Sequence, residues 1–243
     1  MRIFLVLISI ASFALASCQT LDRGSFGPFK RSLNNKSYGY SVVKDFTGRS
    51  GVEFVERFEV RAGDCGSSSQ WSDCRSDRER SELSGPKDGF QGSINWYGWS
   101  IFVPETFQNI FPTKLALGQF HQLRGPPAFM FQNSVGGYWF DENFGHSRIP
   151  IKLIADEELL GKWNRIEVHA KWHKSDGFMK VFVNGEQKVD FRGRTMTEDV
   201  VYFKYGVYRS FVSRYKNFYR KSLPTQIVYF ANVKRSKTRE GLN

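Results

Sequence analysis

Apolar and polar residues alternate with a period of two along much of the chain. Residues 54–61 and 165–172 each place mostly apolar side chains at one set of alternate positions and mostly charged ones at the other. Successive side chains of a strand point to opposite faces, so both stretches predict half-buried β-strands. Residues 95–104 carry aromatic side chains at both sets of positions, which predicts a strand in the middle of a sheet.

A turn signal joins two further predicted strands. Residues 179–183 and 188–191 flank Asn184-Gly185, a dipeptide that accepts the positive φ values of a tight hairpin turn. Helical periodicity is scarce, apart from one turn near residues 156–160. The pattern predicts one all-β domain. The simplest fold that accounts for it is a β-jelly roll, a concanavalin-like sandwich of two antiparallel sheets with a concave substrate cleft.

Three stretches carry charged or acid–base side chains at alternate positions. They are Arg78-Glu79-Arg80-Ser81-Glu82-Leu83, Gln119-Phe120-His121 and Tyr202-Phe203-Lys204-Tyr205-Gly206-Val207-Tyr208-Arg209. Alternate residues of a strand share one face. The side chains that share a face are Arg78, Arg80 and Glu82 in the first stretch, Gln119 and His121 in the second, and Tyr202, Lys204 and Tyr208 in the third. Such faces on a concave sheet can form an active cleft.

The start of the chain predicts export. Met1-Arg2 precedes an apolar run over residues 3–15. The run is too short to span a bilayer as a stable helix and is typical of a secretory signal. The signal, residues 1–17, ends in the pattern of a bacterial lipoprotein, with Cys18 as the lipidated first residue of the mature chain. Residues 18–30 then form a tether and residues 31–243 the folded domain. Ordinary cleavage after Ala16, which gives a secreted protein, is the alternative.

Two cysteines remain in the mature chain. Cys65 and Cys74 lie nine positions apart in a loop rich in glycine and serine. In an oxidising compartment they are expected to form one disulfide. A metal site is the weaker alternative, because the two thiols have no His or Cys partners nearby.

The chain is strongly basic. Its formal net charge is +11, and the predicted signal contains one arginine and no acidic residue, which leaves +10 on the mature chain. A basic surface favours nucleic acid, anionic lipid or an acidic glycan. Export argues against nucleic acid, and an aromatic content of 16% supplies flat surfaces for sugar rings. Charge alone does not separate lipid from glycan, but the three charged stretches favour an anionic polysaccharide as the partner. We also expect membrane contact only through the lipid anchor, and a monomeric chain.

The three charged stretches resemble the signature strands of β-jelly-roll polysaccharide lyases, and they occur in the same order. Alginate lyases of that fold carry R-S/T-E-L, Q-I/V-H and Y-F-K-A-G-V/I-Y segments, and the heparin lyase I-like and glucuronan lyase group shares the K-x-x-x-Y spacing. Here the last segment continues with Arg209, where alginate lyases usually continue with Asn-Gln, and this favours a glucuronate-containing polymer. The resemblance covers roughly residues 50–235. It implies a carbon–oxygen lyase that cuts a uronic-acid polysaccharide by β-elimination.

The chemistry of β-elimination calls for the same residue types. The C5 proton of the uronate becomes acidic only when its carboxylate is neutralised, a task that suits Arg80 and Gln119. His121 can act as the base near neutral pH, and the Tyr208 hydroxyl can protonate the leaving O4. Tyr208 can also be the base where C5–H lies on its side of the sugar. Lys204 either assists Tyr208 by its positive charge or binds the substrate carboxylate.

Further side chains are predicted to contact the substrate. They are Arg78, Trp139, Tyr202 and Arg209. Simpler interpretations compete with some of these roles. Arg80 and Glu82 can form a cross-strand ion pair on a solvated face, and such a purely structural part is favoured for Arg78 and Glu82, whereas Arg80 is expected to be functional. Tyr202 can belong to the packing of the sheet.

Two other functions fit the same fold, because a fold alone does not decide the chemistry. A glycoside hydrolase needs two carboxylates that flank one bond, and the densest acidic cluster, residues 156–158, cannot direct all its side chains into one cleft. A non-catalytic carbohydrate-binding module explains the basic and aromatic surface, but it does not require His121, Lys204 and Tyr208 together. The sequence contains no metal-binding motif. Elimination requires no cofactor, and a structural calcium ion held by loop carbonyls would leave no mark in the sequence.

Overall fold

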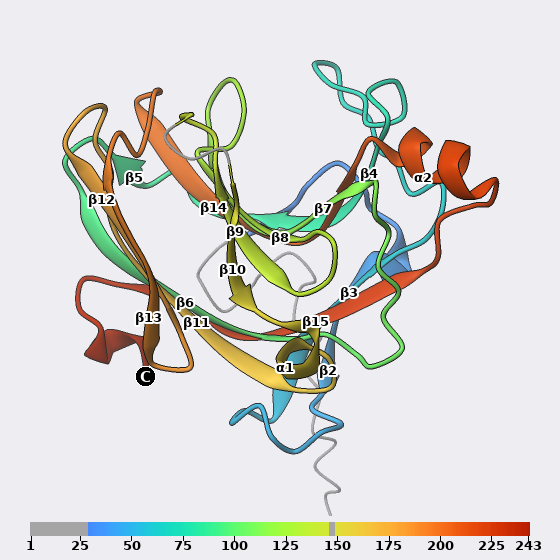
Figure 1. Ribbon diagram of the computed structural model, residues 1–243, viewed down its shortest axis with the longest axis horizontal. Coiled ribbons are helices and arrows are strands. Elements are labelled where there is room, and N and C mark those ends of the chain that lie inside the picture. Colours follow the sequence, from blue (N-terminus) through green and yellow to red (C-terminus); the bar gives the residue numbers. More distant parts are fainter. Residues whose placement is uncertain (1–28, 146–148) are drawn as a thin grey trace, which may run out of the picture.

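The computed structural model describes residues 29–145 and 149–243 (Figure 1). The predicted signal, Cys18 and all but the last two residues of the predicted tether lie outside the described residues. Those last two residues belong to the fold: Phe29 is buried in the core and Lys30 begins the first strand. The domain therefore starts slightly before residue 31.

The protein is a jelly roll of two antiparallel sheets, as predicted. In spatial order, the first sheet contains β1 (Lys30–Arg31), β4 (Arg78–Ser84), β14 (Val200–Ser210), β7 (Lys114–Gln122), β8 (Phe129–Asn133), β9 (Tyr138–Glu142) and β10 (Ile151–Ile154), and the short β5 (Gly89–Phe90) pairs with β14. The second sheet contains β13 (Glu186–Gly193), β12 (Gly177–Val183), β11 (Trp163–Lys171), β6 (Ile94–Phe102), β15 (Gln226–Ser236), β3 (Phe54–Val60) and β2 (Tyr40–Lys44).

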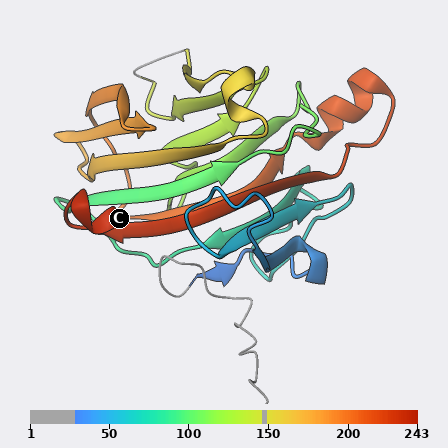
Figure 2. The same ribbon diagram turned by 90° about the horizontal axis from the view of Figure 1, so that it is seen from below.

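Within residues 29–145 and 149–243, helices are few and short. The α-helices are α1 (Asp156–Leu159) and α2 (Val212–Tyr219), and the 3-10 helices are η1 (Ser37–Gly39) and η2 (Glu240–Leu242). In Figure 1 the first sheet lies above the second and its outer face curves upward at the sides, while Figure 2 shows the long strands of the second sheet from below. Within the described residues, no helix is long and apolar enough to cross a membrane.

The strands follow the predicted periodicity. β3 and β11 occupy the two stretches of clear alternation, and β6 lies in the middle of the second sheet. The predicted hairpin is formed by β12 and β13, and both residues of its turn have positive φ, 49° at Asn184 and 87° at Gly185. The expected helical turn near residue 156 is α1.

Aromatic side chains fill the space between the sheets. The buried Trp99 ring from the second sheet packs against Phe131 and Phe203 of the first, with centroids 5.0 and 4.8 Å away. Edge and tilted contacts of this kind add specific geometry to a large burial of apolar surface. The core therefore fixes how the first sheet lies on the second, and with it the shape of the outer concave face.

A β-bulge in β14 contributes to that shape. β14 and β7 shift register between the pairs Tyr205–Gly118 and Tyr208–Ala116. Gly206 lies in the bulge at a φ of 125°, and an added Cβ would come within 2.4 Å of the Ser81 carbonyl oxygen. Only glycine fits here. The bulge bends β14 immediately before Tyr208.

Candidate active site

The three charged stretches lie side by side in the first sheet, because β14 pairs with β4 on one side and β7 on the other. Tyr208 is paired with Arg80, and Lys204 with Gln119. A groove with a cavity volume of about 570 Å³ lies on their outer face. All five residues predicted to be catalytic line it: Arg80, Gln119, His121, Lys204 and Tyr208.

The lining of the groove is positively charged. Its cationic side chains are Arg78, Arg80, Lys114, Arg124 and Lys204. No Asp or Glu occurs among the lining residues in the described part of the chain. A concave site with charges of one sign concentrates ligands of the other sign. The groove is therefore suited to a polyanion.

Glu82 lies beneath the groove and binds three of the lining side chains. Its carboxylate accepts hydrogen bonds from Lys204 Nζ at 2.7 Å, Arg80 Nη1 at 3.1 Å and Gln119 Nε2 at 2.5 Å. Burial lowers the pKa of Lys204, and the Glu82 charge opposes that effect. Glu82 is thus paired with Arg80, as the simpler interpretation supposed, and also with Lys204, but the pair is buried and does not lie on a solvated face.

The guanidinium group of Arg80 is directed mainly at the protein. It binds both carboxylate oxygens of the buried Asp73 at 2.6 Å, and its Cζ lies 4.3 Å from the centre of the Tyr208 ring. The two acidic partners keep the pKa of Arg80 high despite burial. Arg80 therefore holds a positive charge against the face of Tyr208.

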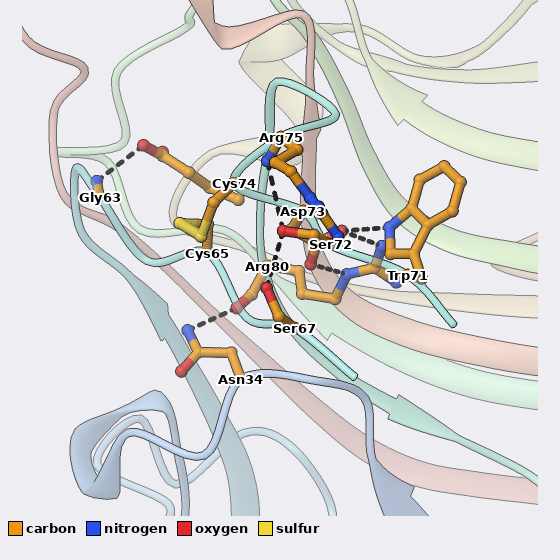
Figure 3. The surroundings of a disulfide bond; sticks show 11 residues. Asn34, Gly63, Cys65, Ser67, Trp71, Ser72, Asp73, Cys74, Arg75 and Arg80 are labelled. Atoms are coloured by element: carbon orange, nitrogen blue, oxygen red, sulfur yellow. Dashed lines mark hydrogen bonds and ion pairs between the residues drawn. A yellow bond between two sulfur atoms is a disulfide. The ribbon is translucent and has the colours of Figure 1, made fainter. Parts of the chain in front are cut away.

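The predicted disulfide is present between Cys65 and Cys74, and it lies beside Asp73 (Figure 3). The loop that it closes also carries Trp71, whose Nε1 donates to Asp73 Oδ1 at 2.9 Å. Trp71 is 47% exposed and lines the groove. Neither Trp71 nor Asp73 was predicted as a site residue, since a loop has no periodicity from which to infer the direction of a side chain.

His121 is neutral at physiological pH. Burial and the positive charge of Lys204 lower its pKa to about 4. Its Nδ1 lies 2.5 Å from the Gln122 carbonyl oxygen, which can only accept a hydrogen bond, so Nδ1 carries the proton and Nε2 the lone pair. This is the tautomer that a base requires.

Gln119 has an unsatisfied acceptor. Its side chain is almost completely buried, and within the described residues its Oε1 has no hydrogen-bond partner. The opposite orientation of the amide would place Oε1 against the Glu82 carboxylate, which donates nothing when ionised. A buried acceptor of this kind is expected to meet a donor from a ligand.

The predicted substrate contacts divide into two groups. Tyr202 and Arg78 line the groove, and the Tyr202 hydroxyl lies 3.3 Å from His121 Nδ1. Trp139 lies on the same face of the sheet but outside the groove, where its Nε1 donates to the Gly136 carbonyl and Lys152 covers its ring.

The prediction for Arg209 is wrong. Its side chain is completely buried, and it binds Glu79 Oε2 at 3.0 Å and Gln226 Oε1 at 2.9 Å. The reason is strand alternation: Arg209 follows Tyr208 directly and so points to the opposite face. Its place is inside the sandwich.

No metal site is apparent in this part of the molecule. Among residues 29–145 and 149–243, no group of three or more His, Cys, Asp or Glu side chains is placed to hold a metal ion. The groove residues described above can act without one, since they supply a base, an acid and positive charge.

Fold and groove together define a jelly-roll protein with a positively charged groove that suits an acidic polysaccharide. The sequence profile described as polysaccharide lyase matches residues 21–234, and the chain belongs to this family. Its activity is that of a lyase, which breaks a uronic-acid polysaccharide by β-elimination. A comparison with curated proteins found no match.

Solved structures share the fold at low sequence identity. An endo-β-1,4-glucuronan lyase from the fungus Trichoderma reesei is 16% identical, with a TM-score of 0.56 over 86% of this chain and 96% of that chain. An alginate lyase from Corynebacterium sp. is 15% identical, with a TM-score of 0.56 over 89% and 90%. A β-glucanase catalytic domain from Podospora anserina is 11% identical, with a TM-score of 0.57 over 87% and 86%. Since the fold occurs in lyases and in a glucanase, it does not by itself identify the reaction.

Proposed function

We propose that the groove cuts a glucuronate-containing polymer, with Tyr208 as the residue that transfers protons and Lys204 and Gln119 as the groups that neutralise the carboxylate. The observation that carries the proposal is the convergence of Tyr208, Lys204, Gln119 and His121 on one groove whose lining is cationic. We assign the stabilisation of the negative charge of an enolate-like intermediate to the positive charge of Lys204 and to the Gln119 Nε2 hydrogen that Glu82 does not engage.

Arg80 takes a different part from the one that the sequence suggested. Asp73 and Glu82 occupy most of its donors, and its guanidinium stacks on the Tyr208 ring. This contact fixes where the Tyr208 ring lies in the groove. Arg80 therefore acts on the reaction through Tyr208, as a positioning residue.

The stereochemistry of the sugar decides which group removes the C5 proton. In glucuronate and mannuronate, C5–H and O4 lie on the same side of the ring, so an ionised Tyr208 can take the C5 proton and return it to O4. The C4–O4 bond breaks, and a C4–C5 double bond forms. In guluronate the two lie on opposite sides, and His121 Nε2 is then the base while Tyr208 is the acid.

The choice of glucuronate as the substrate unit rests on one similar solved structure and not on Arg209. The Trichoderma reesei structure is that of a glucuronan lyase, and almost all of that chain is covered. Arg209 is buried, so the departure from the alginate lyase sequence at this position lies beneath the groove and does not contact substrate. We also propose that the exported monomer is held at the cell envelope by a lipid on Cys18.

Ultraviolet absorbance tests the proposal, because the new double bond is conjugated with the carboxylate. The mature chain is mixed in turn with glucuronan, polymannuronate, polyguluronate, hyaluronan and heparin. We expect a rise on glucuronan, and none with Tyr208→Phe on any polymer. His121→Ala should abolish the rise on a polymer in which His121 is the base and only weaken it elsewhere. A chain that binds a polymer without any rise would instead be a binding module.

A further inference from the structure

Phe211 is an exposed aromatic residue at one end of the groove. It follows the last residue of β14, is 36% exposed and lines the groove together with Ser210 and Arg78. Strand residues rise by about 3.4 Å each, so Phe211 lies roughly 10 Å along the chain from Tyr208. A polymer that extends along the groove from Tyr208 to Phe211 would meet Phe211 with a sugar unit other than the one on which Tyr208 acts.

The backbone holds Phe211 in a conformation that aromatic residues rarely adopt. Its φ is 61° and its ψ 48°, in the left-handed region. Two hydrogen bonds fix the residue: its N–H donates to the Asp77 carbonyl at 2.9 Å, and its carbonyl accepts from Thr113 Oγ1 at 3.0 Å. The Asp77 carboxylate in turn accepts from the Ser213 N–H at 2.9 Å. Conformations of this kind persist where the surroundings enforce them, often at binding sites.

Two guanidinium groups flank the Phe211 ring. The Cζ atoms of Arg78 and Arg214 lie 4.2 and 4.1 Å from its centre. Within the described residues, neither arginine forms an ion pair with a carboxylate. The ring thus holds two uncompensated positive charges against its surface, and both arginines can donate paired hydrogen bonds to a carboxylate or sulfate.

We propose that Phe211, Arg78 and Arg214 form a distal subsite that binds an acidic sugar unit of the same polymer, several bonds from the linkage that is cut. The subsite rests on the proposed function, and it extends that function by making the rate depend on chain length. Binding energy gained at such a distance from the reaction is available to orient the sugar at Tyr208.

The test compares oligomers of increasing length from the polymer that the lyase cuts. Phe211→Leu keeps an apolar side chain and the same backbone demand but removes the flat ring, and Arg214→Gln removes one charge from an exposed helical position. We expect each variant to lower kcat/KM on the longest oligomer about tenfold more than on the shortest, a factor typical of one stacking contact or one ionic hydrogen bond. Phe218→Leu is the matched control, because Phe218 lies on α2, is 70% exposed and does not line the groove.

If both variants lose kcat/KM equally on oligomers of all lengths, the subsite is overturned. It is also overturned if Phe218→Leu shows the same dependence on oligomer length, because the effect would then belong to the whole surface of α2. Thermal melting shows whether Phe211→Leu folds, and Arg214→Gln decides the matter if it does not. If the wild-type chain cuts no polymer, the proposed function fails. The same variants are then compared by calorimetric binding to each polymer, where an unchanged affinity for every polymer overturns the subsite as well.

Discussion

The ionisation of His121 in the groove depends on burial and on the charge of Lys204. The Lys204 ammonium group binds Glu82 at 2.7 Å and lies 5.9 Å from the centre of the Tyr208 ring. Its positive charge opposes protonation of the imidazole, and burial acts in the same direction. The free enzyme therefore keeps His121 as a neutral acceptor over the whole range in which most enzymes work.

A direct titration tests this account. We expect the His121 ring to titrate near pH 4 in an NMR experiment, well below an ordinary histidine, and Lys204→Gln to move its pKa upward because the opposing charge is gone. His121→Ala identifies the signal among the four histidines.

Lys114→Gln is the control for that titration, because it removes a different cation from the groove lining. It should leave the His121 signal near its wild-type midpoint. An unchanged midpoint in Lys204→Gln would contradict the assigned role of Lys204.

Strand alternation explains which residues the sequence could identify. It placed Arg80, Lys204 and Tyr208 correctly on one face, because the period of two holds along paired strands. The same rule, applied strictly, puts Arg209 inside the sandwich, where it is found. Phe211 gave no such signal, since its position depends on the end of β14 and on contacts with a loop distant in sequence.

Among the elements, the loop closed by the disulfide has the most direct effect on the site. It carries Asp73, which fixes both ends of the Arg80 fork, and Trp71, which forms part of the groove wall. Figure 3 shows these side chains next to the Cys65–Cys74 bond. A short loop rich in glycine and serine has little packing of its own to hold it, so the bond limits where Asp73 can lie.

Removal of the disulfide is expected to lower both stability and activity. The double change Cys65→Ser and Cys74→Ser should cost about 2–3 kcal/mol of the free energy of unfolding, by the loop-closure estimate. It should also reduce kcat/KM, because the Arg80 guanidinium is no longer held against Tyr208. Urea unfolding and the absorbance assay measure the two effects.

Asp73→Asn tests whether the disulfide acts through Asp73. If it does, a variant that combines Asp73→Asn with Cys65→Ser and Cys74→Ser loses little more activity than Asp73→Asn or the cysteine pair alone. The reason is that the effects of residues that act as a unit do not add. Fully additive losses in kcat/KM would show that the loop affects the reaction by another route.

The elements differ in how far the sequence specified them. β3, β11 and the β12–β13 hairpin follow from alternation and from the Asn-Gly turn, which are local signals. α2 was not predicted, because only Val212 and Tyr215 of its eight residues are buried, too few for a helical period. The bulge at Gly206 depends on the close approach of Ser81 from another strand, and no local pattern records that contact.

At the scale of the whole molecule, a buried carboxyl group connects the two sheets. Glu56 from β3 accepts hydrogen bonds from the hydroxyls of Tyr40 and Tyr205, each at 2.9 Å. Tyr205 belongs to β14 and directly follows the groove residue Lys204, so its side chain points to the opposite face of the sheet, beneath the site. Burial raises the pKa of Glu56 from 4.5 to about 7, although both hydroxyls favour its ionised form.

This group makes the stability of the sandwich depend on pH. Between about pH 4.5 and 7 the folded state keeps a proton on Glu56 that the unfolded state has lost, so the free energy of unfolding falls as pH rises through this window. The stabilising contribution is present in full below the window and lost above it. A shift of this size corresponds to about 3 kcal/mol.

Glu56→Gln should remove this part of the pH dependence, because an amide accepts the same hydroxyl hydrogen bonds without titrating. Urea unfolding at pH 5 and pH 8 gives the change in the free energy of unfolding between the two pH values for each protein. Subtracting the change in the variant from that in the wild type cancels the groups that titrate in both, including His121. Glu53→Gln, at an exposed neighbouring position, should retain the wild-type difference. If Glu56→Gln loses as much stability between the two pH values as the wild type does, the buried carboxyl is not the group responsible, and the layers beneath the groove are held together independently of its proton.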